Sequence, residues 1–257
     1  IFMMKKTSKW QKKNYSNFED KAISQIGKDL YHAFIRDYTF KQWGKDPKNL
    51  PQTIFNRLPI RYNYQEDYFK NCKWQGIPKD GYTQIFKNLT SSKKIKIELN
   101  YKYKLDDKIK PKYATIYTGP LDKLFNYKLG KLEWRSLLFK KEIIKNVEDY
   151  QGTSVINFPE KKFKYTRIHE PKHLHLERDL KSNSTLIIKE DPNGNYQEPY
   201  YPIGDTKNRN LHRKYKRFLF NRKNFFIGGR LADYAYYDMD MTISAALVKF
   251  DKMIKNF

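Results

Sequence analysis

The order of hydrophobic and polar residues divides the chain into a helical first part and a strand-rich middle. Behind a capping pair formed by Ser16 and Glu19, apolar residues recur at helical spacing, which predicts a helix beginning near Asn17. A second stretch repeats apolar residues every four positions over 30–38, on one helical face, and ends near Gly44. We therefore expect helical structure from about Asn17 to Gly44.

After Gly44 the sequence predicts a loop, a short helix and then strands. Residues 43–51 hold a glycine and two prolines among polar residues, which predicts a loop able to move as a lid. Residues 82–89 predict a short helix. Over 95–105 apolar and polar residues alternate strictly, so we expect two strands with a bend there.

Residues 114–117 predict another short strand. Between residues 132 and 188, short β-rich runs separated by turn residues predict an antiparallel sheet; they cover 137–144, 153–158, 163–168 and 185–188. An amphipathic helix near 211–219, a strand at 225–227, a Gly-Gly turn and a last helix from Asp238 follow. This closing order is typical of a nucleotide-binding α/β layer, in which small residues let the backbone approach a phosphate.

The chain is strongly basic, because 52 Lys and Arg face 28 Asp and Glu, a net charge of +24. Such a charge first suggests a polyanionic partner. The lysines are spread over the whole length together with many Asn, Tyr, Phe and Ile, a pattern that an A/T-rich genome explains, so we expect no nucleic-acid partner. The densest cluster lies on the polar side of the amphipathic helix and is interpreted as a solvated face. It consists of Arg213, Lys214, Lys216, Arg217, Arg222 and Lys223.

Three further features of the sequence indicate where the protein resides and whether it binds a metal. No apolar run approaches the roughly 20 residues of a membrane span, and the single Cys72 excludes an intramolecular disulfide, so we expect a cytoplasmic protein. His169, His173 and His175 lie close together, the last two on one face of an expected strand, but only carboxylates could complete a zinc site. We expect no bound metal.

Aromatic and arginine residues in distinctive local contexts carry the strongest functional signal. They occur in the segments 38–44 (YTFKQWG), 57–61 (RLPIR), 165–167 (YTR), 198–202 (EPYYP) and 228–239 (GGRLADYAYYDM). In this order and at these separations, the set resembles the UDP-galactopyranose mutases, flavoenzymes that interconvert the six-membered and five-membered ring forms of UDP-galactose. The resemblance covers nearly the whole chain from Asn17 onward.

The resemblance implies an α/β (mixed α+β) fold, in which an incomplete Rossmann-like FAD domain carries an inserted helical domain and an antiparallel β-sheet domain. The helical substrate-binding domain would span 1–77, the sheet domain 121–203, and the remnant of the FAD domain 78–120 and 204–257. Family members begin with a Gly-x-Gly-x-x-Gly unit that this sequence does not contain. Because the sequence also begins with Ile, we expect a piece of a longer protein, short by on the order of a hundred residues.

The function implied by the resemblance is the interconversion of UDP-galactopyranose and UDP-galactofuranose by covalent catalysis through reduced FAD. The protein would be an isomerase with UDP-galactose as substrate and would form a homodimer in its longer form. The isolated chain is expected to be colourless and inactive. Asp37 stands where many family members have Gly, and it adds a negative charge beside the expected diphosphate site unless it points outward.

The resemblance also assigns three groups of site residues. We expect six of these residues to converge on one cleft, namely Tyr38, Arg57, Tyr68, Arg167, Tyr201 and Tyr236. Catalytic roles, with both arginines on the diphosphate, fall to Arg57, Arg167, Trp43, Tyr236 and Asp238. Substrate binding, with Tyr38 as the platform for uracil, falls to Phe34, Tyr38, Thr39, Tyr68, Asn157 and Tyr201. Cofactor binding falls to Tyr117, Thr118, Gly119, Gly228, Gly229, Arg230 and Met239.

Two other interpretations remain open. A different flavoprotein of the same topology, such as an amine oxidase, would not need the uridine platform or the diphosphate arginines. A basic polyanion-binding module predicts steep salt dependence across many nucleic-acid sequences and no preference for UDP.

Overall fold

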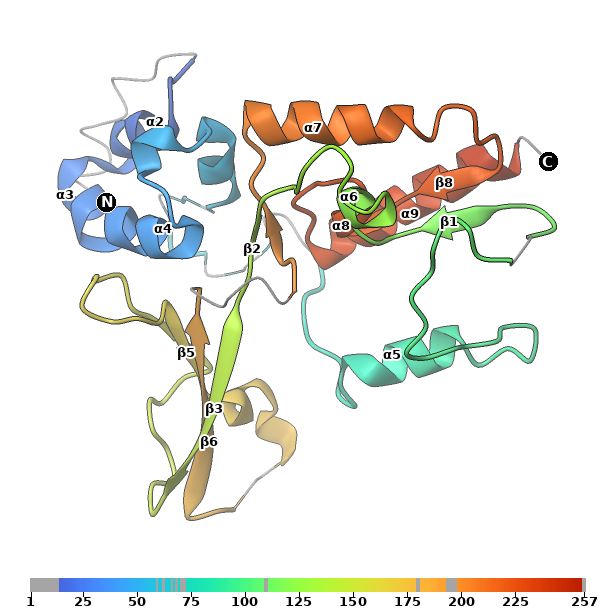
Figure 1. The fold of residues 1–257 in the computed structure, drawn as a ribbon. Coiled ribbons are helices and arrows are strands. Elements are labelled where there is room, and N and C mark those ends of the chain that lie inside the picture. The colour runs from blue at the N-terminus through green and yellow to red at the C-terminus, as the bar shows by residue number, and fades with distance from the viewer. Residues whose placement is uncertain are drawn as a thin grey trace. The chain divides into compact units, whose positions relative to one another are not determined.

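The computed structural model describes residues 14–58, 60, 61, 63–65, 67, 69, 73–108, 111–178, 181–192 and 198–255. The chain divides into two compact units. Unit 1 comprises residues 1–101 and 137–194, and unit 2 comprises residues 102–136 and 195–257. Figure 1 shows helices and strands in both, which confirms a mixed helical and sheet protein. The finer domain boundaries expected at 77, 120 and 203 stay a prediction.

The first helix of unit 1, α2 (Phe18–Ile26), begins where the sequence predicts it but is capped differently. The side chain of Asn17 accepts a hydrogen bond from the backbone N–H of Asp20 at 2.9 Å, so the expected cap at Ser16 is wrong. Glu19 does not reach back to a capping residue because its carboxylate accepts a 2.7 Å hydrogen bond from the buried Tyr31 hydroxyl.

The second helical stretch is continuous but contains one wider turn. It consists of α3 (Lys28–Leu30), the π-helix η2 (Tyr31–Ile35) and α4 (Arg36–Trp43). A π-turn holds an extra residue. The common face expected for the four-residue spacing over 30–38 stays a prediction. Gly44 ends the run in the left-handed conformation with φ 62°, as predicted.

The segment predicted as a lid is packed against the helices. It contains the 3-10 helix η3 (Pro47–Asn49), and Leu50 after it is 2% exposed. The next 3-10 helix, η4 (Gln52–Arg57), brings Phe55 edge-on to Phe18 with ring centroids 5.3 Å apart. Lid motion therefore stays a prediction, and any opening would have to expose these side chains.

The alternating segment at 95–105 forms no strand, so that prediction is wrong. A strand needs a neighbour for its backbone hydrogen bonds and a covered face for its apolar residues. No strand in the described part of the chain pairs with this segment, and Leu99 is 82% exposed. The helix predicted just before it is confirmed as α5 (Tyr82–Leu89).

Unit 1 also holds a four-stranded antiparallel sheet, as the middle of the sequence predicts. Its order is β3-β6-β5-β4, and Figure 1 shows β3 and β6 as its long strands. The strands are β3 (Leu138–Lys145), β4 (Val155–Asn157), β5 (Arg167–His169) and β6 (Ser184–Asp191). The strand expected over 163–168 is shortened to β5, because the rings of Phe158, Phe163 and Tyr165 pack on one another in the preceding loop.

Two 3-10 helices, η5 (Pro171–Leu174) and η6 (Leu176–Arg178), follow β5. The strand expected to carry His173 and His175 is therefore absent.

The described residues of unit 2 form two short strand pairs and four helices. The parallel pair joins β1 (Thr115–Tyr117) to β8 (Phe225–Ile227), and the antiparallel pair joins β2 (Trp134–Arg135) to β7 (Tyr201–Pro202). The helices are α6 (Leu121–Leu124), α7 (Thr206–Arg217), α8 (Gly229–Ala232) and α9 (Met239–Ile254). Leu121, Tyr215 and Ala232, all fully buried, form the centre of its core. No helix in the described residues is long and apolar enough to cross a bilayer.

Candidate functional site

Three polar side chains form a row across the sheet of unit 1. Asn157 on β4, Arg167 on β5 and Glu190 on β6 are register partners, which places them on one face. The Arg167 guanidinium donates through Nε to Asn157 Oδ1 at 3.2 Å and through Nη1 to Glu190 Oε2 at 3.4 Å. Two residues assigned to the substrate site are thus in direct contact.

Glu190 anchors this row, although it was not identified as a site residue from the sequence. Its side chain is buried, its Oε2 also lies 3.1 Å from His169 Nε2, and its Oε1 has no hydrogen-bond partner among the described residues. A buried carboxylate held between two nitrogen donors fixes the orientation of the arginine. Only strand register brings it opposite Arg167, and register cannot be read from spacing.

Tyr38 on α4 contacts the same arginine, with its ring centroid 5.8 Å from the guanidinium carbon of Arg167. An aromatic ring beside a guanidinium is a favourable pair and leaves a platform next to a fixed positive charge. The two residues assigned from the sequence to one site therefore contact each other within unit 1, and their roles toward a substrate stay predictions.

Lys41, one turn after Tyr38, explains how the helix and the sheet are held together. Its ammonium, which carries three N–H donors, lies within hydrogen-bond distance of four backbone carbonyls of the loop between β4 and β5, and burial lowers its pKa. The acceptors are Phe158 (2.6 Å), Glu160 (3.0 Å), Phe163 (3.3 Å) and Tyr165 (2.9 Å). Sequence reasoning included Lys41 in a motif but assigned it no role, because its partners lie more than a hundred residues away.

The other site residues of unit 1 are placed as follows. Thr39 and Trp43 are buried in α4, and Phe34 is 59% exposed. The added charge of Asp37 is balanced, because Arg36 Nε donates to its carboxylate at 2.8 Å. Their roles stay predictions, as do those of Tyr68 and the Arg57 side chain, which lie outside the described residues.

In unit 2, Tyr201 and Tyr236 stack face to face, with ring centroids 4.9 Å apart and an interplanar angle of 9°. The guanidinium carbon of Arg230 lies 5.6 Å and 5.0 Å from these rings. Arg230 also donates to the carbonyls of Tyr237 at 2.9 Å and Tyr200 at 3.1 Å. The arginine thus fixes both tyrosines, and its expected contact with a pyrophosphate stays a prediction.

Five of the residues assigned to the cofactor lie at the carboxyl ends of β1 and β8, namely Tyr117, Thr118, Gly119, Gly228 and Gly229. Tyr117 pairs with Ile227, and the N–H of Gly228 donates to the Tyr117 carbonyl at 3.1 Å. Gly229 has φ +80° and lies against Thr118. Ligands of α/β sheets bind at the carboxyl ends of parallel strands, so this edge suits a nucleotide.

The turn after β1 and a hollow next to it bear on the fit of a cofactor. A Cβ on Gly119 would lie 2.5 Å from the Tyr117 hydroxyl, so the lack of a side chain there lets the Tyr117 ring pack over the turn. A hollow of about 650 Å³ in unit 2 is lined by Tyr117 and Gly119 and by the cations Lys102 and Lys123. Asp238 precedes α9, and Met239 is 62% exposed at its first position.

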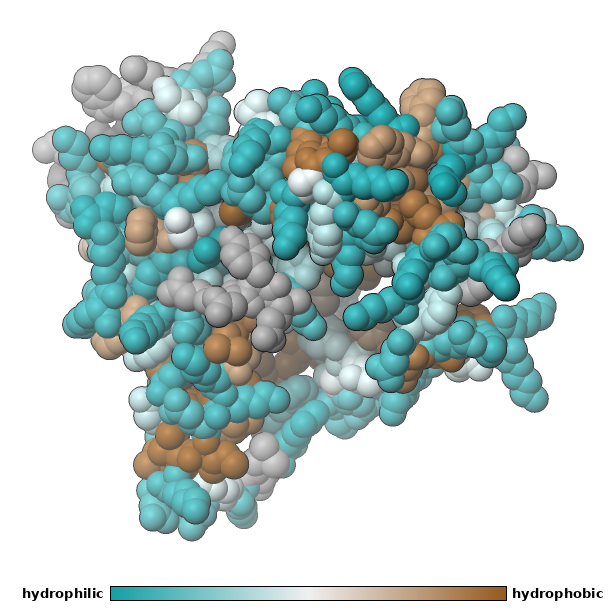
Figure 2. All heavy atoms as spheres, in the orientation of Figure 1, coloured by the Kyte–Doolittle hydropathy of each residue, from teal (hydrophilic) through white to brown (hydrophobic). Residues whose placement is uncertain are grey.

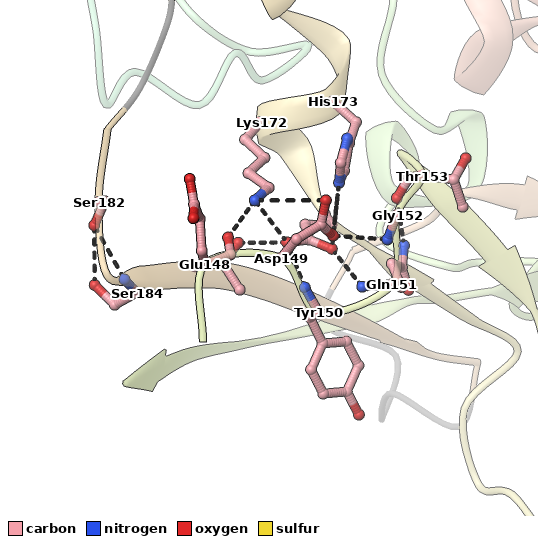
Figure 3. Close-up of polar contacts among 12 residues, drawn as sticks. Glu148, Asp149, Tyr150, Gln151, Gly152, Thr153, Lys172, His173, Ser182 and Ser184 are labelled. Carbon is pink, nitrogen blue, oxygen red and sulfur yellow. Dashed lines mark hydrogen bonds and ion pairs between the residues drawn. The ribbon is translucent and has the colours of Figure 1, made fainter. Parts of the chain in front are cut away.

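A second polar cluster lies beside the sheet of unit 1, where Figure 3 shows Asp149, Lys172 and His173 pointing toward one another. Ligand atoms of Asp149, Glu170 and His173 lie within 4.8 Å of one another, the spacing of a metal site. However, the Lys172 ammonium lies 3.7 Å from Glu170 and 3.8 Å from Asp149 and supplies a competing charge.

The carboxylates of this cluster already accept several hydrogen bonds. Fully buried Glu170 accepts from the N–H groups of Tyr150 (3.1 Å) and Gln151 (2.9 Å) and from the Thr185 hydroxyl (2.6 Å). The cluster therefore acts as a structural clamp between the 149–152 turn and β6. The expectation of no metal stays a prediction.

Replacing Glu170 by Gln should weaken unit 1 and change its response to acid. Burial alone would raise the pKa of Glu170, but hydrogen bonds from Thr185, Tyr150 and Gln151 hold the pKa below its usual value. Its stabilising contribution is therefore present above the pKa of an unfolded glutamate and lost as pH falls through the folded pKa. At pH 7 we expect a loss of about 1–3 kcal/mol of unfolding free energy in urea.

Between about pH 5 and pH 3 the variant should lose less stability than the parent chain. Glu148→Gln, at an exposed neighbouring carboxylate, is the matched control and should behave like the parent. Equal acid sensitivity of the parent chain and Glu170→Gln would contradict the clamp.

Comparison with known proteins first defines the fold. A solved structure described as reduced UDP-galactopyranose mutase matches with a TM-score of 0.66 at 15% identity, covering 91% of this chain and 66% of that one. The fold is thus similar to that of this mutase.

The sequence comparisons then show the family. A family model for UDP-galactopyranose mutase matches residues 33–236. Relatives include a protein named "Probable UDP-galactopyranose mutase" of Klebsiella pneumoniae (38% identical, 93% of this chain, 61% of that protein) and a dTDP-fucopyranose mutase of Escherichia coli (35%, 93% and 64%). A UDP-galactopyranose mutase of Mycoplasma genitalium is 34% identical over 89% of this chain and 61% of its own length. The chain belongs to the UDP-galactopyranose mutase family and spans about three fifths of the length of these relatives.

Proposed function

We propose that the protein to which this chain belongs is an isomerase that interconverts UDP-galactopyranose and UDP-galactofuranose. The observation that carries the proposal is the contact between Tyr38 and Arg167 in a chain of this family. An aromatic face suits the uracil base, and a guanidinium suits the diphosphate next to it.

Arg167 would bind the diphosphate and stabilise the negative charge that grows on UDP as the bond to the sugar breaks. A fixed cation performs this task best, because no reorganisation is needed when the charge appears. Asn157 and Glu190 hold the guanidinium on one side, and Lys41 holds Tyr38 close to it. Arg57, Tyr68, Tyr201 and Tyr236 would complete the set of donors to the diphosphate oxygens.

FAD would lie at the carboxyl ends of β1 and β8, within a Rossmann-like domain that the longer protein completes. When bound and reduced, the flavin supplies the nucleophile for the sugar carbon. Gly228, Gly229 and Gly119 would let the cofactor approach the backbone, and Arg230 would keep the Tyr201–Tyr236 stack in place. The longer protein is proposed to form a cytoplasmic homodimer.

The test is chromatographic separation of the two ring forms after incubation with the longer, FAD-loaded protein, reduced with dithionite. We expect conversion of UDP-galactofuranose to UDP-galactopyranose only in the reduced state. The dTDP-fucopyranose substrate named for the Escherichia coli relative serves as the competing substrate. Rearrangement of that substrate alone would contradict the UDP-galactose assignment, and rearrangement of neither would contradict the proposed activity.

A further inference from the structure

Helix α7 and the turn after it carry a concentration of positive charge that the composition of the chain does not explain. No Asp or Glu occurs from residue 206 to 232, a stretch that holds nine Lys and Arg. Four of the eleven arginines of the chain lie between residues 209 and 222. A/T-rich codons raise the number of lysines, but they do not gather arginines in one place.

The side chains involved form what we call the basic face. It consists of Arg209, Arg213, Lys214, Lys216, Arg217, Arg222 and Lys223, all exposed and none paired with a carboxylate in the described part of the chain. Like charges four residues apart, as at Arg209, Arg213 and Arg217, destabilise a helix. The helix dipole favours cations in the last turn only, so it leaves Arg209 and the two residues beyond the helix unexplained.

The opposite side of α7 keeps the helix in place. Asn208, His212 and Tyr215 are buried at steps of four and three residues. The Asp205 side chain caps the first turn by accepting from the Asn208 N–H at 2.9 Å. Because the inner side and the cap secure the helix, the charges on its outer side are available for a partner.

An aromatic side chain projects beside these charges. Phe220, in the turn between Arg217 and Arg222, is 89% exposed, and Phe218 is 44% exposed. Figure 2 shows hydrophobic residues interrupting the hydrophilic surface over the C-terminal half of α7. Cations that reach headgroup phosphates and an exposed apolar ring that reaches the acyl boundary are the two contacts that hold a protein on an anionic membrane surface.

We propose that the basic face docks this protein on an anionic phospholipid surface, with the cations on headgroup phosphates and Phe220 inserted at the acyl boundary. Nucleic acid fits less well, because single-strand binding uses a row of rings along a groove, whereas one ring protrudes here. The proposal is independent of the proposed enzymatic function.

The test is co-sedimentation of the longer, FAD-loaded protein with vesicles of phosphatidylcholine, with and without phosphatidylglycerol. We expect binding only to the anionic vesicles, weakening as salt rises. Each cation near such a surface strengthens binding about fivefold, so R213Q/K216Q/R217Q should bind about a hundredfold more weakly. K141Q/K145Q/K164Q, which removes three exposed lysines of unit 1, is the control of equal net charge and should bind like the parent.

Phe220→Ser separates a membrane partner from a nucleic-acid partner. We expect it to weaken vesicle binding roughly tenfold through the lost apolar contact, while binding to duplex DNA stays unchanged. Equal loss in the two triple variants would show that net charge alone acts, and no binding to anionic vesicles would overturn the proposal. Tighter binding to DNA than to vesicles, with Phe220→Ser without effect, would replace it by a polyanion site.

Discussion

Replacing Arg167 by Ala should lower kcat/KM of the longer, FAD-loaded protein for UDP-galactofuranose roughly 10²- to 10³-fold, the loss typical of one preorganised donor at a developing negative charge. The substitution removes the guanidinium next to Tyr38 and leaves the buried Glu190 without this partner. The measurement is the rate of ring interconversion by chromatography in the presence of dithionite.

Lys145→Ala is the matched control, because Lys145 is exposed on β3 and has no ion pair among the described residues. Its kcat/KM should equal that of the parent protein. If Arg167→Ala lowered the rate no more than this control, the arginine would not contact the diphosphate.

The second large effect is expected for Lys41→Met, which should cost about 3 kcal/mol or more of unfolding free energy. Methionine nearly preserves the volume but removes the charged donor that Lys41 offers to the part-buried carbonyls of the loop, and each hydrogen bond to a charged group contributes about 1.5–3 kcal/mol. Urea unfolding followed by circular dichroism measures the loss.

Lys48→Met provides the comparison, because Lys48 is exposed and its ion pair with Glu19 is long at 3.8 Å and therefore weak. We expect it to change stability by less than about 1 kcal/mol. Equal midpoints for the two variants would show that Lys41 does not hold the loop between β4 and β5. The Lys41 variant should also weaken substrate binding, because that loop leads directly into Arg167.

Features set by local chemistry were predictable from the sequence. The start of α2 near Asn17 and the end of α4 at Gly44 depend on neighbours within a few residues. The strands of the unit 1 sheet follow from β-rich runs bounded by turn residues. The strict alternation over 95–105 gave a wrong prediction, because a strand exists only when another strand pairs with it.

Only part of the candidate site was predictable, because contacts between residues distant in sequence cannot be read from local patterns. Tyr38 and Arg167 were identified through the resemblance to the mutases, and their contact is present in the structure. Lys41 and Glu190 were missed because their roles arise from contacts with residues distant in sequence. The histidine cluster was read as a strand, whereas His173 belongs to a 3-10 helix and bonds to Asp149.

The central claim is that Arg167 binds the diphosphate of a uridine nucleotide whose base lies on Tyr38. The most direct measurement is calorimetric titration of UDP and of uridine into the longer protein and its Arg167→Ala variant. We predict that the variant loses the preference for UDP over uridine by roughly tenfold or more, the scale of a charge-assisted hydrogen bond, while uridine binds as before. An unchanged ratio of the two dissociation constants would contradict the account.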